Sequence, residues 1–555
     1  MVQAGGSATG GGSPGRSALG RRRAAAALTA LVVALSLGAI ALQAYQEIRL
    51  GPVPSFREQA CGLPKAWLER TRRGYYAPRS GQISLLPRTP AYMASGGDGW
   101  SHSGPWPYLQ DVPLVFYGPD IVPALGDVDT PVTLADVAPT MAAMSASSIP
   151  TPDGTRLKVA MESGARRPRL VLVIVWDGGG WNTLRMYDGD WPNLARLMRE
   201  GVSFTNATVG SSPSVTPAVH STIGTGAYPW RAGVTGVPVR DEEGEVVDAF
   251  LEGVSSRFLQ LPTLAERNDE LYGNRPRVGM LGYEPWHLGM IGQGAERSGG
   301  DKDDAVWLDV ETNEWITNPD HYRLPRAVTE TGGLQRYLDE LDAEDGAIDR
   351  SWRDHAILDE PDRVEETPAF IRFHADALVN LIRRGGYGDD RLTDLLFTNF
   401  KQIDRVGHYF NMASPEVRDS LIATDEQLGR IVEEVEADVG RGRYVVIVTA
   451  DHGQQPDAAA IEGYGIDPNE VERDIDAAFG PVTDAVWPTE VFLDDEALER
   501  EGVTIDEVAR WLGDYRLDDN DEDVDIAGRG EFEATDRLFA LSIPARMLPG
   551  IECGG

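Results

Sequence analysis

Two stretches of this chain are apolar at almost every position and end where polar residues begin. They read LVLVIVW over residues 170–176 and YVVIVT over residues 444–449. Unbroken apolar runs of this length are typical of strands buried on both faces of a parallel sheet. Shorter apolar runs predict two further strands, at residues 112–118 and 395–399. We therefore expect a sheet that is covered on both faces.

Amphipathic segments separate these strands. Apolar residues recur at helical spacing over residues 134–144, 194–200 and 417–438, so we expect helices there. Strands that alternate with helices indicate a mostly parallel α/β sheet between two layers of helices. The stretch 238–390 is less regular and rich in Trp, Arg and acidic residues. We expect it to form a cap-like insertion over the sheet.

The N-terminus carries a targeting pattern. Residues 1–23 form a Gly/Ser/Ala-rich tail that closes on three consecutive arginines, and an apolar run follows at residues 24–42. Nineteen apolar residues are long enough to span a bilayer, and the arginines would stay in the cytoplasm, which places the rest of the chain outside. Ala39-Ile40-Ala41 also fits a cleavage site, so a single-pass cell-membrane anchor and a cleaved signal peptide of a secreted protein both stay open. A juxtamembrane segment at residues 43–79 follows.

Composition and charge narrow the choice of function. Hydrophobic residues make up 42% and charged residues 25% of the 555 positions, as in ordinary globular proteins. The formal net charge is −36, and such a field repels nucleic acid, so we expect no nucleic-acid partner. Two cysteines occur, Cys61 and Cys553. In an oxidising compartment they can pair, and two unrelated thiols are the alternative that the sequence leaves open.

Acidic and histidine side chains follow three of the predicted strands. Asp177 ends the first apolar run, Asp404 and His408 follow the run at 395–399, and Asp451-His452 follow the last one. Carboxyl ends of parallel strands gather at one edge of a sheet, where ligands bind. Asp404 and His408 are four residues apart, which puts both on one face of a helix. Asp and His ligands together suit Zn²⁺, with Mn²⁺ or iron as alternatives.

A further candidate is Thr216, in the segment SVTPAVHSTIGTGAYPW. Thr216 fits a helix N-cap and Pro217 the first helical position. A capping role alone would explain this residue. The alternative is a nucleophile at a positive helix end, where backbone N–H groups hold an anion and a nearby metal favours the alkoxide.

Together these motifs resemble the alkaline phosphatase superfamily, in particular its type I phosphodiesterase/nucleotide pyrophosphatase branch. The resemblance rests on WPNLARLMREGVSFTNA, TPAVHSTIGTGAYP, IDRVGH and TADHG, and it covers most of the chain after residue 80. It implies a superfamily-type α/β/α sandwich in residues 80–555, with a nucleophile region at 168–237 and a second metal-ligand region at 391–555. By the same resemblance, one metal is held by Asp177, Asp451 and His452 beside Thr216, and a second by Asp404 and His408.

Members of that family complete the second site with a histidine from a late segment. No histidine follows His452, yet SHSGPWPYLQDVPLVFYGPDI at residues 101–121 resembles that late segment. The resemblance therefore implies a circular permutation, in which residues 80–155 are the family's C-terminal piece placed first and His102 is the missing ligand. Chain ends of compact domains often lie close together, which permits such a rearrangement. A Cys61–Cys553 disulfide would then join the new ends.

The resemblance also implies a phosphate ester as substrate. Two divalent metals, Zn²⁺ or Mn²⁺, would clamp the phosphoryl group while Thr216 forms a phosphothreonine intermediate that water hydrolyses. Phosphodiesterase relatives often carry Asn in a TGN sequence where this chain reads Thr235-Gly236-Val237. The cap region is then expected to supply a substitute. A phosphodiesterase is favoured, a phosphomonoesterase is the alternative, and an inactive surface binding protein on the same fold is the third possibility.

Overall fold

The computed structural model describes most of the chain after the candidate membrane segment. Its described residues are 52–94, 101–150, 152–251, 255–344, 346–361, 363–520, 532–533 and 535–554. The predicted apolar segment at 24–42 lies outside them. Within the described ranges, no helix has both the length and the apolar character needed to cross a membrane.

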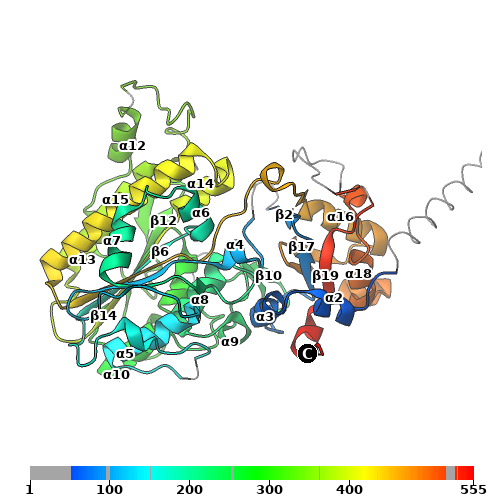
Figure 1. Ribbon diagram of the computed structural model, residues 1–555, viewed down its shortest axis with the longest axis horizontal. Helices are drawn as coiled ribbons and strands as arrows, with labels where there is room; N and C mark the ends of the chain where they lie inside the picture. The colour runs from blue at the N-terminus through cyan, green and yellow to red at the C-terminus, as the bar shows by residue number, and fades with distance from the viewer. Residues whose placement is uncertain are drawn as a thin grey trace, which may run out of the picture. The chain divides into compact units, whose positions relative to one another are not determined.

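A mostly parallel sheet forms the centre of the larger lobe (Figure 1). In the described residues it has nine strands, in the order β13-β12-β11-β14-β6-β15-β3-β7-β4. Their bounds are Leu114–Tyr117 for β3, Gly126–Val128 for β4, Leu170–Trp176 for β6, Val202–Phe204 for β7, Val278–Leu281 for β11, Asp304–Asp309 for β12, Glu314–Ile316 for β13, Asp394–Phe400 for β14 and Tyr444–Thr449 for β15. The strands from β12 to β15 in this order are parallel, whereas β3 runs antiparallel to both β15 and β7.

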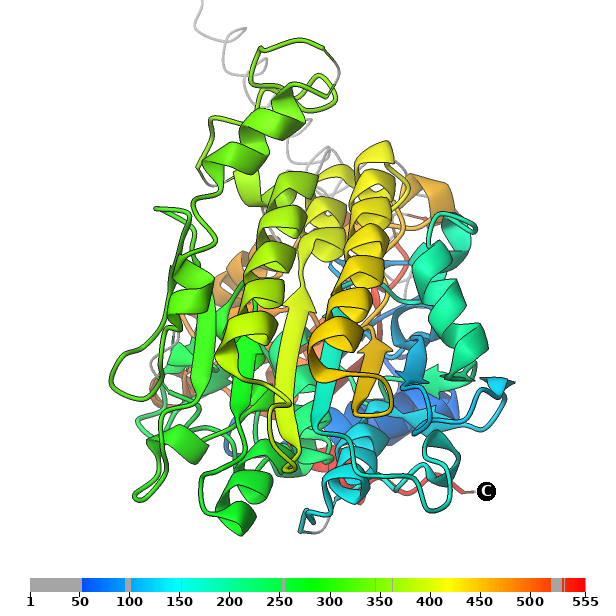
Figure 2. The same cartoon turned by 90° about the vertical axis from the view of Figure 1, so that its left-hand side faces the viewer.

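Helices cover both faces of this sheet, which explains the unbroken apolar run of β6. Leu172 and Ile174 face one hydrophobic cluster, and Val171 and Val173 face the other. The first cluster includes residues of α7 (Pro192–Glu200), α13 (Pro368–Gly385) and α15 (Pro415–Val439), and the second includes residues of α5 (Val137–Ser145), α8 (Thr216–Thr225) and α10 (Leu264–Tyr272). Figure 2 shows α13 and α15 side by side along the sheet. The fold is the expected alkaline phosphatase-like α/β architecture.

The region 238–390 differs from the cap that its irregular sequence predicts. It supplies three strands, β11, β12 and β13, that extend the central sheet beyond β14. β11 has four residues and is interrupted by Gly279, where a Cβ atom would lie 2.2 Å from the Tyr387 hydroxyl. β12 begins with Asp304, whose charge is buried against Arg323 and Tyr387. β11 and β12 therefore lack the long apolar run from which β6 could be predicted.

A second, four-stranded antiparallel sheet forms a smaller lobe, which sequence patterning did not predict as a separate unit. Its order is β17-β18-β1-β19, and the strands span Thr483–Trp487, Glu490–Leu493, Ile83–Pro87 and Phe539–Pro544. Helices α16 (Pro468–Phe479) and α18 (Ile505–Leu512) contribute side chains to its core. Part of the expected juxtamembrane segment is folded here as well, because α2 (Phe56–Gly62) packs against β19 and α3 (Lys65–Gly74) follows it.

The first and last described segments of the chain lie next to each other. β1 pairs with β19 in antiparallel register, and Cys61 forms a disulfide with Cys553 at a Cα–Cα distance of 5.4 Å. The Arg57 guanidinium also donates to the Glu552 carbonyl at 2.6 Å. The pairing of the two cysteines is therefore confirmed, and it closes a loop of sequence separation 492.

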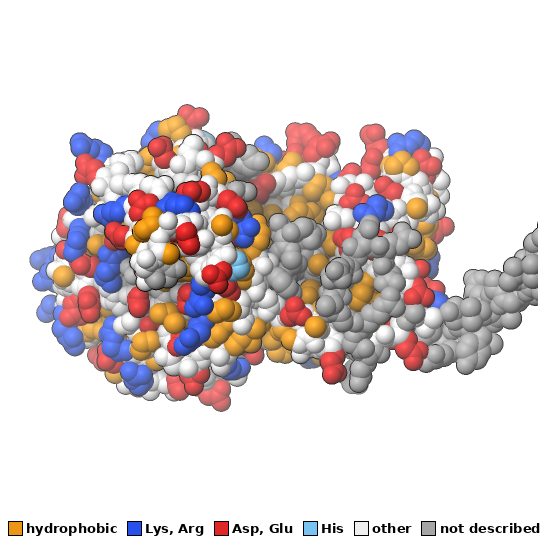
Figure 3. All heavy atoms as spheres, turned by 90° about the horizontal axis from the view of Figure 1, so that it is seen from above, with side chains coloured by type: hydrophobic (Ala, Val, Ile, Leu, Met, Phe, Trp, Pro, Cys, Tyr) orange, Lys and Arg blue, Asp and Glu red, His pale blue; other side chains and the backbone are white. Residues whose placement is uncertain are grey.

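Acidic and basic side chains are intermixed on the surface of the larger lobe. On the face shown in Figure 3, acidic groups are spread over both lobes, whereas Lys and Arg side chains lie mainly on the larger one. On this face, the Asp and Glu side chains that outnumber Lys and Arg in the sequence are therefore spread out and do not form a single patch.

Candidate active site

Three neighbouring parallel strands end at one edge of the large sheet and place the predicted acidic residues there. β6 lies between β14 and β15, with Trp176 opposite Phe400 and Val175 opposite Thr449. Asp177 directly follows β6, and Asp451-His452 follow β15 after one residue. Asp404 and His408 lie in α14 (Gln402–Phe410), which begins two residues after β14 ends. The shared register therefore brings the three predicted acidic and histidine segments to one edge of the sheet.

A glycine allows the turn after Asp177 to approach Asp404. Gly178 has φ of +68°, and a Cβ atom there would lie 3.0 Å from the Asp404 Cα. Its N–H donates to the Asp451 carboxylate at 3.3 Å. A side chain at this position would be strained and would push the two ligand-bearing segments apart.

His102 reaches the same edge from the N-terminal part of the chain. Because β3 is antiparallel to β15, the start of β3 lies where β15 ends, and the loop of His102 precedes it. The His102 ring stacks on His452 with a centroid distance of 3.6 Å. Its Nε2 atom lies 3.6 Å from an Asp404 oxygen, and His408 Nε2 lies 3.3 Å from the other.

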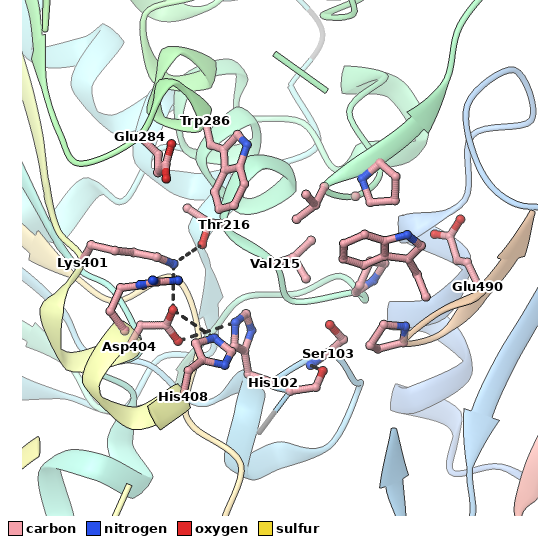
Figure 4. Close-up of a pocket in the computed structure, with 18 of the residues that line it drawn as sticks. His102, Ser103, Val215, Thr216, Glu284, Trp286, Lys401, Asp404, His408 and Glu490 are labelled. Atoms are coloured by element: carbon pink, nitrogen blue, oxygen red, sulfur yellow. Dashed lines mark hydrogen bonds and ion pairs between the residues drawn. The ribbon is translucent and has the colours of Figure 1, made fainter. Parts of the chain in front are cut away.

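Thr216 is the first helical residue of α8 and faces this cluster (Figure 4). The sequence predicts Thr216 as the N-cap, but Val215 occupies that position and the Thr216 hydroxyl makes no capping bond. The hydroxyl instead donates to Asp177 at 3.4 Å, and Lys401 Nζ donates to it at 3.1 Å. Since Thr216 is only 2% exposed, its orientation is fixed by these contacts. All seven predicted site residues thus lie together.

The donor atoms of the cluster fit divalent metal ions. His102 and His452 each direct Nδ1 to a backbone carbonyl at 3.0 Å, which leaves Nε2 of both rings facing the carboxylates. His452 Nε2 and Asp451 Oδ2 are buried without a hydrogen-bond partner among the described residues. Buried polar atoms without a hydrogen-bond partner are costly unless a ligand such as a metal cation binds them.

Within this cluster there are two groups of three residues whose possible ligand atoms lie within 4.8 Å of one another. One set is His102, Asp404 and His452, and the other is Asp177, His220 and Asp451. His220 belongs to α8, and its Nε2 lies 3.5 Å from Asp451, while its Nδ1 pairs with His287 at 3.0 Å. The sequence favours a packing role for His220. The structure places it against a predicted ligand.

Lys401 is the residue that sequence reasoning missed. Its ammonium lies 3.0 Å from Asp177 and 2.8 Å from Asp404, so it connects a carboxylate of each predicted metal set to the Thr216 hydroxyl. The only signal in the sequence is its position, immediately after the buried strand β14 and three residues before Asp404. Asn399, on the same strand, donates to Asp177 at 2.9 Å.

Burial and close charges shift the pKa values in this cluster. Burial alone would lower the pKa of Lys401, but Asp177 and Asp404 outweigh it and raise that pKa above its usual value. Burial would raise the pKa of Asp404, yet the Lys401 ammonium and His408 hold it well below its usual range. Burial and the neighbouring His452 lower the pKa of His102, which keeps it neutral as metal binding requires.

A cavity of about 250 Å³ opens beside Thr216. Its walls are largely apolar and aromatic, and they include Val215, Tyr283, Trp286, Trp487 and Phe492. Gly236 and Val237, of the segment where the resemblance leads one to expect an Asn, also line it. The predicted cap region contributes Glu284 and Trp286, so it does reach the cavity, but the polar group nearest to Thr216 is Lys401 from outside that region.

The chain is similar to known proteins in sequence and in fold. A family model described as "Type I phosphodiesterase / nucleotide pyrophosphatase" matches residues 171–524, more than half of the chain. The match begins in β6, so the segment of His102 lies outside it.

Three relatives are similar at low sequence identity. A protein named calcium-transporting ATPase from Myroides odoratus is 25% identical over 407 residues, covering 62% of this chain and 72% of the relative. Alkaline phosphatase PafA from Elizabethkingia meningoseptica is 24% identical, and alkaline phosphatase PhoV from Synechococcus elongatus is 25% identical, each over 52% of this chain. This chain spans 60% and 59% of the lengths of these two phosphatases.

The fold has a solved counterpart. The crystal structure of wild-type PafA superposes with a TM-score of 0.53 at 21% identity, covering 63% of this chain and 76% of the other. The match of the family model over residues 171–524, on a fold that this structure shares, leads to one conclusion: the chain belongs to the type I phosphodiesterase/nucleotide pyrophosphatase family of the alkaline phosphatase superfamily.

Proposed function

We propose that this protein is a metal-dependent phosphodiesterase that acts outside the cytoplasm with Thr216 as its nucleophile. The observation that carries the choice of a diester is the lining of the cavity beside Thr216. Among the described residues, one Lys and one Arg side chain line this cavity, Lys401 and Arg405. Arg405 already pairs with Glu366 at 3.3 Å, so the Lys401 ammonium is left as the one side-chain cation of the lining that can meet a phosphoryl oxygen. A phosphomonoester presents two negative charges to such a site, whereas a diester carries one charge and a second organic group that apolar walls can bind.

The proposed ligands of the metals are those of the predicted sets. Asp177, Asp451 and His452 would hold one divalent ion beside Thr216, because His452 Nε2 lies 3.3 Å from Asp177 and 3.6 Å from Asp451. Asp404, His408 and His102 would hold the other, and His220 is positioned to orient Asp451. When bound, the two ions, for which Zn²⁺ and Mn²⁺ suit the ligands, neutralise phosphoryl charge and favour ionised oxygen nucleophiles.

The residues of the chain then divide the reaction between them. Thr216 Oγ1 attacks phosphorus, the bond to one alcohol breaks, and that alcohol leaves with a proton. Water hydrolyses the phosphothreonine and returns the Thr216 hydroxyl. We assign to Lys401 the contact with a phosphoryl oxygen that the family's Asn would make, because its ammonium lies 3.1 Å from Thr216 Oγ1.

We also propose that the chain is a circular permutant of its family. The family match begins at residue 171 in β6, and the His102 segment enters the site from residues that precede this strand. The joined ends of the described chain, through β1–β19 pairing and the Cys61–Cys553 disulfide, support this order of segments. The disulfide also supports a location outside the cytoplasm, where such bonds persist. A single-pass anchor at residues 24–42 remains part of the proposal.

The test compares matched aryl phosphate substrates on zinc-loaded protein comprising residues 46–555. We expect faster hydrolysis of methyl p-nitrophenyl phosphate than of p-nitrophenyl phosphate, and loss of both rates in Thr216→Ala. Thr222→Ala makes the same substitution in the same helix, where the hydroxyl donates to the Ala218 carbonyl of that helix, and serves as the control. Absence of Thr216-dependent diester hydrolysis would refute the proposal.

A phosphomonoesterase is the second candidate. The names of two relatives, alkaline phosphatases PafA and PhoV, favour it. A Thr216-dependent preference for p-nitrophenyl phosphate in the same assay would select this candidate.

A further inference from the structure

The wall of the cavity in the smaller lobe pairs an indole with a carboxylate. Trp487 ends β17 and Glu490 begins β18, and the two residues lie directly opposite each other across the hairpin. Side chains of such a pair share one face of the sheet. Both line the cavity, and Figure 4 shows Glu490 on the side away from Lys401. Trp487 is 41% exposed, so its ring surface is open to a ligand.

A second carboxylate lines the opposite wall, beside another indole. Glu284 is a near neighbour of Trp286, whose Nε1 donates to Asp248 at 2.7 Å and thereby fixes the ring. Among the described residues, the Glu284 carboxylate has no hydrogen-bond or ion-pair partner. Glu490 accepts one hydrogen bond, from the Gly81 N–H at 2.7 Å, and its other oxygen has no partner there.

The nearby cations do not neutralise these carboxylates directly. Lys401 lies within 3.0 Å of Asp177 and Asp404, and Arg405 pairs with Glu365 and Glu366. Two carboxylates in an apolar cavity carry a desolvation cost that a ligand of opposite charge would offset. In agreement with this, burial raises the pKa of both Glu284 and Glu490 to about 7.

We propose that the cavity binds a positively charged alcohol group of the phosphodiester, an ammonium-bearing alcohol such as choline or ethanolamine. Indole faces and carboxylates are the groups that attract substituted ammonium ions. A volume of about 250 Å³ is enough for such a group beside the phosphoryl centre, and below the usual size of pockets for larger ligands. A nucleotide alcohol with further phosphates would bring anions against two carboxylates. This inference rests on the proposed phosphodiesterase function.

The experiment uses two diesters that differ only in charge. p-Nitrophenyl phosphocholine carries a trimethylammonium group, and p-nitrophenyl 3,3-dimethylbutyl phosphate carries the isosteric tert-butyl group. At pH 8.5, above the pKa of both glutamates, we expect kcat/KM on zinc-loaded protein to be at least tenfold higher for the choline diester. The ratio should fall to about one third of its value or less in Glu490→Gln and in Glu284→Gln. Glu496→Gln, on an exposed helix of the same lobe, should keep the full ratio.

The outcomes separate the two proposals. Equal kcat/KM for both diesters, with Thr216-dependent turnover, would overturn the ammonium inference and leave the phosphodiesterase standing. A charge preference that neither glutamine variant reduces would also overturn it, because the preference would then arise elsewhere. Turnover of p-nitrophenyl phosphate alone would remove the phosphodiesterase proposal itself. The comparison of the two diesters on the unaltered protein does not depend on the folding of any variant.

Discussion

At the scale of single residues, the site holds buried carboxylates whose negative charge is partly offset by one buried ammonium. Three carboxylates, on Asp177, Asp404 and Asp451, are at most 1% exposed, and Lys401 is 4% exposed among them. An uncompensated buried charge is far more costly than a surface one. The ammonium therefore stabilises the metal-free cluster and also holds positive charge beside the Thr216 hydroxyl.

Replacing Lys401 tests its proposed contact with the phosphoryl oxygen. Lys401→Met keeps the length of the side chain and removes the charge, and we expect kcat/KM for the diester to fall by about 10²-fold, as for loss of one fixed stabilising group. Zinc content, measured by mass spectrometry, should stay at the wild-type level, because Lys401 is not a ligand. A Met variant with the wild-type rate, or one whose lost activity follows lost zinc, would contradict this role.

His102 is the residue on which the proposed second metal site and the proposed permutation both depend. We expect His102→Ala to lower zinc content by about one ion per chain and activity as severely as His408→Ala, because both rings face Asp404. His321→Ala changes a histidine of a loop outside the site and should leave both quantities unchanged. Full zinc content in His102→Ala would remove this residue from the ligand set.

At the scale of elements, the sequence predicts best what is buried on both sides. β6 and β15 lie within one residue of their predicted bounds. Their side chains are apolar on both faces, and a strand between two layers of helices is the structure that buries both faces. The strands of region 238–390 could not be predicted from local patterns, because their Gly279 and Asp304 are explained by tertiary contacts. Gly279 leaves room for the Tyr387 hydroxyl, and Asp304 pairs with Arg323 and Tyr387. The role of Lys401 could not be predicted for the same reason. Its function arises from neighbours on β6 and α8 that no local pattern reveals.

The free energy of unfolding should depend on pH because of Glu490, the first residue of β18 in the β17–β18 hairpin. Burial raises the pKa of this carboxyl from 4.5 to about 7 in the folded protein. A raised pKa means that the stabilising contribution is complete below pH 4.5 and is lost as pH rises through about 7. Glu490→Gln mimics the protonated form, so we expect equal stability of variant and wild type at pH 4.5.

At pH 8 the Glu490→Gln variant should be the more stable of the two. The shift corresponds to roughly 3 kcal/mol at full ionisation, and partial exposure of the group lowers our expectation to about 1–2 kcal/mol. Thermal unfolding of both proteins at the two pH values measures this difference. A constant gap between the two melting temperatures would show that Glu490 does not titrate in this range.

At the scale of the whole molecule, the disulfide joins segments from opposite ends of the chain. Closing a loop of sequence separation 492 restricts the unfolded chain strongly, and disulfides typically contribute about 2–4 kcal/mol. We expect the double variant Cys61→Ser/Cys553→Ser to melt at a lower temperature and to keep its activity at 25 °C, because β1–β19 pairing still holds the ends. Dithiothreitol should shift the wild type by the same amount and leave the double variant unaffected.

The proximity of these ends also predicts that the proposed permutation can be reversed. Cys61 and Cys553 have Cα atoms 5.4 Å apart, so a flexible linker of about eight residues from Gly554 to Ser55 spans the gap. New ends fit in the exposed stretch 162–164, which lies between the proposed permuted piece and β6. Such a chain keeps every strand pairing, and we expect it to fold with full zinc content and at least one tenth of the wild-type kcat/KM. A matched chain opened at residue 397, within buried β14, should fail to fold. If neither chain folded, the result would contradict this prediction and would show that folding requires the present order of segments.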